Sequence, residues 1–103
     1  MIDIFDYISG DKTEPTTRVQ LKDRTGLSDR DNRSLIMEAR TSQEINPRGV
    51  ILSSSSHPGY WISEDTGKID RFIREQRSRI KILASIIRHC ERFKLFHESM
   101  SRK

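Results

Sequence analysis

The sequence predicts a mainly α-helical fold with a small β-hairpin and a long C-terminal α-helix. Three observations predict it: two helix-capping patterns lie on either side of Gly26, two short apolar runs flank Pro58-Gly59, and no proline or glycine follows Gly67. The chain has 103 residues, the size of one domain. Only 33% of them are apolar, against about 45–50%, with glycine counted, in ordinary globular proteins, so the core must be small and local.

The N-terminal residues predict a short first helix over 2–9. Ile2, Phe5 and Ile8 recur at helical spacing, and Gly10 is a suitable end for the helix. The residues that follow are polar, so a loop is expected after the helix.

Two short helices joined by a tight turn are predicted over 17–41. Thr17 and Gln20 have the spacing of a capping box, in which the N-cap side chain bonds the backbone three residues on. Ser28 and Asp31 repeat the pattern for the second helix. A glycine between the helices can take the positive φ that the turn needs, and this arrangement is that of a helix-turn-helix. The residues of the second helix expected to face the core are Leu35, Ile36 and Ala39.

A β-hairpin is predicted over 49–62, because β-branched and aromatic residues replace the helical period there. The runs 49–53 and 59–62 flank a polar tip, and Pro58-Gly59 suits the central positions of a type II turn. A hairpin directly after a helix-turn-helix is a wing. Residues 1–63 are therefore expected to form a winged helix-turn-helix domain.

A long basic amphipathic helix is predicted over 64–103. Isoleucine recurs every seven residues at one seam position and leucine occupies the next, a combination that favours two-stranded coiled coils. The 1–63 domain is too small to cover a stripe about 40 Å long at about 1.5 Å per residue, so we expect a homodimer. The alternative is a helix whose first half packs on its own domain while the rest frays. The predicted dimer-interface residues are Ile73, Ile80, Leu83, Ile87 and Cys90.

The net charge of +4 is unevenly distributed along the chain. Residues 18–42 carry +2 and residues 68–103 carry +7, while the other two segments are acidic. Thirteen of the 19 basic residues are arginine, the side chain suited to bidentate contacts with phosphate and guanine. This excess of basic residues, most of them arginine, favours double-stranded DNA as the partner. An acidic host or phage protein is the alternative. The basic side chains of the long helix include Arg71, Arg74, Arg77, Lys81, Arg88 and Arg92.

Three segments carry a family resemblance: Leu27-Ser28-Asp29-Arg30, Ile51-Leu52-Ser53-Ser54-Ser55 and Gly59-Tyr60-Trp61-Ile62. They resemble small winged-helix proteins encoded by phages and prophages of Gram-positive bacteria. The resemblance covers about residues 2–90 and implies a winged helix-turn-helix fold that binds DNA in phage replication or regulatory regions. Two features depart from the pattern. Asn32 stands where the family usually has a small apolar residue, and the stretch 42–48 is longer than expected.

The second helix of the pair is expected to recognise the DNA sequence. In a helix-turn-helix this helix lies in the major groove, and its N-terminal residues contact base edges. Arg30 and Arg33 are placed for guanine or phosphate, although Arg33 can instead pair with Asp29. Asn32 has three interpretations: it reads adenine, it is a polar residue tolerated near the core, or it marks a modified interface. The predicted DNA-binding residues are Ser28, Arg30, Asn32, Arg33, Ser34, Met37 and Arg40 in the helix, with Ser54, Ser55, Ser56 and His57 at the wing tip.

Signals for catalysis, cofactors and metals are poor, so we expect no enzyme. The sequence has no glycine-rich phosphate loop, paired-histidine spacing or nucleophile motif, and Cys90 is its single cysteine. No stretch approaches the about 20 apolar residues of a membrane span, and the N-terminus lacks the positive region of a signal peptide. We therefore expect a cytoplasmic protein of a bacterial host, without membrane contact.

The expected function is double-stranded DNA binding in transcription regulation or replication set-up. The alternative comes from another class of protein. It is a winged-helix interaction module, for example a phage inhibitor that binds a host protein through its basic helix.

Overall fold

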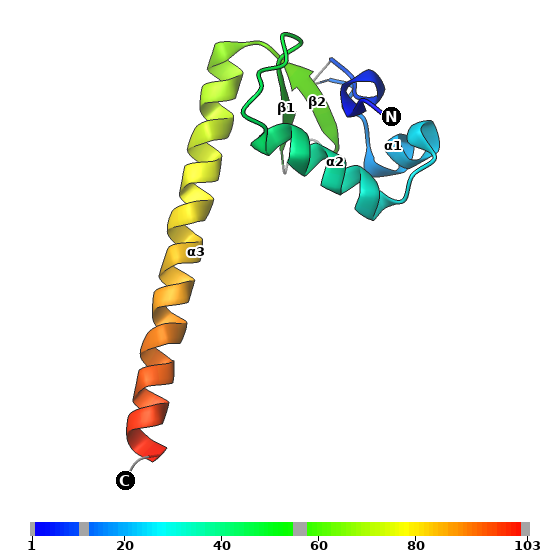
Figure 1. The fold of residues 1–103 in the computed structure, drawn as a ribbon. Coiled ribbons are helices and arrows are strands. Elements are labelled where there is room, and N and C mark those ends of the chain that lie inside the picture. Colours follow the sequence, from blue (N-terminus) through cyan, green and yellow to red (C-terminus); the bar gives the residue numbers. More distant parts are fainter. Residues whose placement is uncertain (1, 11–12, 55–57, 102–103) are drawn as a thin grey trace. The chain divides into compact units, whose positions relative to one another are not determined.

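The computed structural model describes residues 2–10, 13–54 and 58–101. The fold is mainly helical, with a small antiparallel hairpin and a long C-terminal helix, as the sequence predicts (Figure 1). In chain order the described elements are the 3₁₀ helix η1 (Ile4–Tyr7), α1 (Arg18–Thr25), α2 (Asp29–Thr41), β1 (Val50–Ser53), β2 (Tyr60–Ser63) and α3 (Thr66–Ser101).

The chain forms two compact units, Met1–Phe72 and Ile73–Lys103. The first unit extends beyond the predicted 1–63 domain and includes the first turns of α3. The reason is a contact within that unit, where the guanidinium of Arg40 lies over the ring of Phe72, 5.2 Å from its centroid. The first turns of α3 therefore belong with α2 and the hairpin.

The helix predicted over 2–9 is reduced to the single 3₁₀ turn η1, so the prediction is wrong at its C-terminal end. Ile8, the first residue after η1, is extended, with φ −111° and ψ 135°. The cause is pairing with the sheet, because the N–H of Ile62 in β2 donates to the carbonyl oxygen of Ser9 at 2.8 Å. Tertiary pairing here overrides the helical spacing of the apolar residues.

The predicted turn between α1 and α2 and the capping box of α1 are confirmed, whereas α2 shows only the Ser28 half of its predicted box. The N–H of Gln20 donates to Thr17 Oγ1 at 3.1 Å, and the N–H of Thr17 donates to Gln20 Oε1 at 3.0 Å, which completes the capping box. Ser28 Oγ accepts from the N–H of Asp31 at 3.1 Å. Between the helices Gly26 has φ 74°, the left-handed conformation that the turn needs.

β1 and β2 pair antiparallel, and backbone from the N-terminal segment lies along the other edge of β2. Thr16 and Tyr60 exchange two backbone hydrogen bonds of 2.8 Å each. The hydroxyl of Thr16 also accepts from the N–H of Ser9 at 2.8 Å, so it joins the two residues that bridge β2. β2 is thus held on both edges, and residues 55–57 of the predicted hairpin tip lie outside the described residues.

The core of the first unit is small, as the composition predicts. Its buried apolar side chains include Ile4, Ile8, Leu21, Ile36 and Ile51. Leu35 and Ala39 of α2 are half-buried against them, on the face expected to point inward. Leu52 and Trp61 are partners across the hairpin and lie on the face opposite Ile51, and both are buried. The hairpin therefore has apolar side chains on both faces.

Replacing Gly59 with alanine is expected to destabilise the first unit by more than about 1 kcal/mol. Gly59 has φ 113°, and a β-carbon added there would lie 2.5 Å from the carbonyl oxygen of Thr16. The measurement is the urea midpoint of unfolding followed by circular dichroism. Gly10→Ala is the matched control, because a β-carbon there meets no described atom within 4 Å. Equal midpoints for the two variants would contradict the close approach.

Candidate nucleic-acid interface

One face of α2, from Arg30 to Met37, is largely polar and lies in solvent. Arg30, Arg33 and Ser34 are exposed, and Met37 keeps 60% of its surface exposed. The opposite face is fixed in the core by Ile36, which is 2% exposed. The outward orientation expected for these four residues is confirmed, and their contact with DNA stays a prediction.

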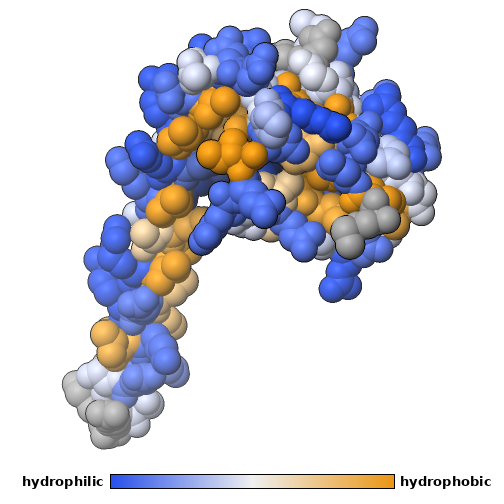
Figure 2. All heavy atoms as spheres, turned by 45° about the horizontal axis from the view of Figure 1, so that its top comes forward, coloured by the Kyte–Doolittle hydropathy of each residue, from blue (hydrophilic) through white to orange (hydrophobic). Residues whose placement is uncertain are grey.

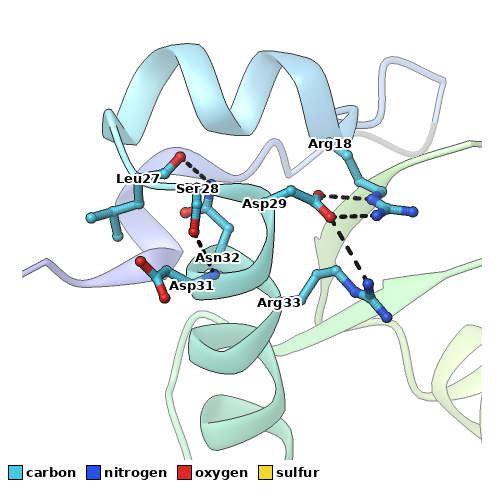
Figure 3. Close-up of polar contacts among 7 residues, drawn as sticks. All are labelled: Arg18, Leu27, Ser28, Asp29, Asp31, Asn32 and Arg33. Atoms are coloured by element: carbon cyan, nitrogen blue, oxygen red, sulfur yellow. Dashed lines mark hydrogen bonds and ion pairs between the residues drawn. The ribbon is translucent and has the colours of Figure 1, made fainter.

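Asp29, the first residue of α2, is held by two arginines (Figure 3). Arg18 of α1 donates from Nε to Asp29 Oδ1 at 2.8 Å and from Nη2 to Oδ2, a bidentate pair. Arg33 approaches the same carboxylate, with 3.9 Å between its Nη1 and Oδ2. The hydrogen bond from Arg18 is the main cause that keeps the pKa of Asp29 below its ordinary value, and it also raises the pKa of Arg18. The carboxylate therefore stays charged, and its charge is compensated.

The two contacts of Asp29 differ in how far the sequence reveals them. The approach of Arg33 is one of the alternatives expected from its spacing of four residues along a helix. The contact with Arg18 was missed, because the two residues lie eleven positions apart on different helices. Each is the first residue of its helix, so the turn between α1 and α2 is what brings the two N-terminal ends together.

Asn32 is buried, so the interpretation that it reads adenine is wrong. The residue is 1% exposed, and its side chain points toward the turn that joins α1 to α2 (Figure 3). Thr25 Oγ1 donates to Asn32 Oδ1 at 2.9 Å, and Asn32 Nδ2 donates to the carbonyl oxygen of Leu27 at 3.4 Å. Asn32 thus links α2 to the end of α1 and to the turn. These bonds explain how a polar residue fits a position expected to be small and apolar.

Arg40 holds the first unit together, which corrects its assignment to the DNA-binding face. Its Nε donates to the carbonyl oxygen of Ile51 at 3.0 Å, and its Nη2 donates to Ser53 Oγ at 3.1 Å. The guanidinium also lies over the rings of Tyr60 and Phe72, at 5.6 and 5.2 Å from their centroids. A guanidinium engaged in this way is occupied within the chain and is removed from the candidate interface.

Most of the predicted wing tip falls outside the described residues. Ser55, Ser56 and His57 belong to that part, so their DNA contacts stay predictions. Ser54 is half-buried at the end of β1. The strands on either side of the tip are in register, with Ser53 opposite Tyr60, so the predicted hairpin itself is confirmed.

The predicted dimer-interface residues all lie on the surface of the single chain. No described residue of α3 is buried. Ile73 keeps 38% of its surface exposed, while Ile80, Leu83 and Ile87 keep 56–64%. Cys90 is exposed as a free thiol. Figure 2 shows apolar residues in orange along the long helix, between hydrophilic residues in blue. Their pairing with a second copy stays a prediction.

An open hollow of about 880 Å³ lies in the first unit between η1, the C-terminal half of α2 and the 42–48 stretch. Arg48 Nη1 donates to Asp6 Oδ1 at 2.7 Å and fastens that stretch to η1. This hydrogen bond is the main cause of the raised pKa of Arg48. The extra length of 42–48 therefore builds one wall of the hollow. Apolar residues of its lining include Phe5, Leu35, Ala39, Ile45 and Val50.

Comparison with known proteins yields no match to a protein-family model, to a curated protein or to a solved structure. Among the described residues, no group of three or more histidine, cysteine, aspartate or glutamate side chains is placed to hold a metal ion. In the same part of the chain, no helix combines the length and apolar character needed to cross a membrane.

Removing the Asn32 side chain is expected to lower the free energy of unfolding by about 1–3 kcal/mol, because Thr25 and the carbonyl oxygen of Leu27 lose a partner. Urea unfolding of Asn32→Ala measures the loss. Ser34→Ala is the matched control, since it removes an exposed polar group from the same helix and should change stability by less than about 0.5 kcal/mol. An Asn32→Ala variant as stable as the wild type would show that the buried amide does not hold the turn.

Proposed function

We propose that this chain binds double-stranded DNA as a winged-helix protein, in transcription regulation or replication set-up. α1, the turn and α2 would serve as the helix-turn-helix, and β1 with β2 as the wing. The observation that carries the proposal is the exposed face of α2, where Arg30 and Arg33 stand on the N-terminal turns. In a helix-turn-helix these turns meet base edges in the major groove.

The connections between the elements support a winged helix. The hairpin follows α2 along the chain, and Ser9 and Thr16 add backbone pairs to the far edge of β2. Arg40 bonds the C-terminal half of α2 to the backbone of β1. A helix in the groove and a wing beside it would therefore be parts of one rigid arrangement.

Compensation of one of the two carboxylates in the first turn of α2 supports contact with phosphates and bases. The carboxylate of Asp29, next to Arg33, is compensated by Arg18. Among the described residues, Arg30 takes part in none of the ion pairs. Ser28 accepts from the backbone of α2 and keeps its own hydroxyl proton to donate to a phosphate. The helix N-terminus adds a partial positive charge at the same place.

Fluorescence anisotropy with a pool of random DNA duplexes over a salt series, followed by sequencing of the bound fraction, tests this function. Affinity that falls steeply with salt, together with an enriched sequence, would support it. Absence of binding at low salt, where even non-specific affinity is measurable, would overturn it.

Arg33→Ala is expected to weaken binding to the enriched duplex by about 1–3 kcal/mol and to relax the sequence preference, because a contact to a base edge is lost. Arg30→Ala is expected to act in the same direction. Arg92→Ala removes the same charge from α3 and is the matched control, which should lower affinity for all duplexes alike. Competition titrations with the enriched and a scrambled duplex measure both effects. An Arg33→Ala variant with unchanged preference would remove α2 as the reading element.

A second function is favoured by where the surplus charge lies. Residues 68–103 carry +7, whereas residues 1–67 carry a net charge of −3. In this hypothesis α3 binds an acidic host or phage protein, as an inhibitor would. Arg74 and Lys81 are exposed and seven residues apart, so they share one side of the helix.

Reversing these two charges, with Arg74→Glu and Lys81→Glu in one variant, separates the two functions. If the chain reads DNA through α2, the variant should lose affinity at low salt and keep its preference for the enriched duplex. If α3 binds an acidic protein, a protein retained from bacterial lysate by the wild type should be lost with the variant. Duplex competition and affinity capture with mass spectrometry give the two readouts. A variant unchanged in both would leave α3 without either role.

A further inference from the structure

The second unit is a helical segment with many exposed apolar side chains. Ten large ones between Ile73 and Met100 keep at least 38% of their surface exposed, and those of the seven-residue repeat form one stripe along the helix. Isolated helices are marginally stable in water, and contiguous exposed apolar surface marks interaction sites. The ten residues are Ile73, Ile80, Ile82, Leu83, Ile86, Ile87, Phe93, Leu95, Phe96 and Met100.

We propose that residues 73–101 pair with the same segment of a second copy as an antiparallel coiled coil centred near Ser85. The proposal fixes an orientation and a register, which the expectation of a homodimer leaves open. It does not depend on DNA binding, because it rests on residues of the second unit alone.

The seven-residue repeat of α3 defines which residues meet in a two-stranded pair. The repeat runs through apolar side chains from Ile80 to Cys90, and polar side chains flank this stretch on both sides. Whether the two helices run parallel or antiparallel decides which residues of the partner the polar seam residues contact. The apolar seam members are Ile73, Ile80, Leu83, Ile87 and Cys90, and the polar members are Gln76, Lys94 and His97.

A parallel pair would bring like charges together. In a parallel coiled coil each seam residue faces its own copy, so Lys94 would face the partner's Lys94. Residues 73–81 carry a net charge of +3, and this segment would lie beside its own copy. Juxtaposed like charges are destabilising, so the parallel orientation is disfavoured.

An antiparallel pair centred near Ser85 groups the apolar seam residues together. Ile80 then faces the partner's Cys90, and Leu83 faces the partner's Ile87. Because the pair has two-fold symmetry, each contact occurs twice. The middle of the interface is therefore apolar throughout, as a coiled-coil seam requires.

The same register pairs two of the polar seam residues, Gln76 and Lys94, and sets the third, His97, against the partner's Ile73 at the end of the seam. Gln76 faces the partner's Lys94, so an amide oxygen meets an ammonium group and neither is set against an apolar side chain. The basic segment 73–81 then lies beside the partner's residues 89–97, which carry two basic residues and one acidic residue. Repulsion is therefore weaker than in the parallel pair, where two copies of the +3 segment lie side by side.

Residues that flank the seam add complementary pairs in this register. Arg77 lies beside the partner's Glu91 on one side, an interhelical ion pair of the kind that sets helix orientation. Arg79 lies beside the partner's Phe93 on the other side, a pair that can form a cation–π contact. Within one helix Arg77 and Glu91 are about 21 Å apart at about 1.5 Å per residue, so only a partner can join them.

Other antiparallel registers lose the pairing of Gln76 with the partner's Lys94. A shift of one heptad in one direction sets Gln76 against the partner's Ile87. A shift in the other direction sets Lys94 against the partner's Leu83. Each shift buries a polar group without a partner, which is costly.

Oxidative crosslinking of the full chain tests the orientation, because Cys90 is the single cysteine of the sequence. In the proposed pair the two Cys90 residues are about 15 Å apart along the axis, beyond the reach of a disulfide. Ile80→Cys places a thiol opposite the partner's Cys90, and oxidation should convert most of this variant into a covalent dimer. The matched control, Ile80→Cys with Cys90→Ser, and the wild type should both stay uncrosslinked on a non-reducing gel.

Two results would overturn the proposal. Crosslinking of the wild type or of the control would indicate a parallel pair. Absence of a crosslink in every variant would rule out this register, and a mass of 12.1 kDa by light scattering would then show a monomer and leave the face to another partner.

A charge exchange gives an independent test of the register. Arg77→Glu sets two carboxylates side by side and should raise the dissociation constant of the dimer several-fold in sedimentation equilibrium. Arg77→Glu combined with Glu91→Arg restores opposite charges and should return the constant close to the wild-type value. A double variant as weak as the single one would show that the two positions do not meet.

Discussion

The guanidinium of Arg40 is the contact on which the first unit depends, because it joins four elements at once. From α2 it donates to Ile51 and Ser53 of β1, and it lies over the rings of Tyr60 in β2 and Phe72 in α3. A planar group with donors on several sides can make these contacts together, whereas a lysine ammonium cannot. The position of the hairpin beside α2 follows from this contact. So does the geometry of any wing beside a recognition helix in the proposed function.

Local signals in the sequence predict most of the fold, because they act through the backbone of neighbouring residues. The capping box at Thr17, the left-handed glycine at Gly26 and the absence of helix breakers after Gly67 each fix a boundary within a few residues. The N-terminal segment shows where such signals fail. Its helical spacing is real, but the edge of β2 offers backbone partners to Ser9 and Thr16, and the chain extends to reach them.

The candidate site was predictable only as far as helical geometry decides which way a side chain points. That geometry places Arg30 and Arg33 outward, and they are exposed. It gives no sign that Asn32 turns toward α1 or that Arg40 meets the hairpin, because both contacts cross between elements. The partner of Asp29 in α1 is hidden for the same reason. A pattern along one helix assigns a face, and the neighbouring elements decide what that face contacts.

The distribution of charge bears on how the proposed function would work. Residues 1–67 carry a net charge of −3, so this part of the chain would gain little from long-range attraction to phosphates. Residues 68–103, with +7, would supply that attraction, and with it most of the salt dependence. The Arg18–Asp29 pair fits this division, because it compensates one of the two carboxylates in the first turn of α2 without making the surface strongly basic. Sequence preference would then reside in α2 and overall affinity in α3. An antiparallel pair would combine two copies of each in one assembly, so that neither unit has to provide both properties alone.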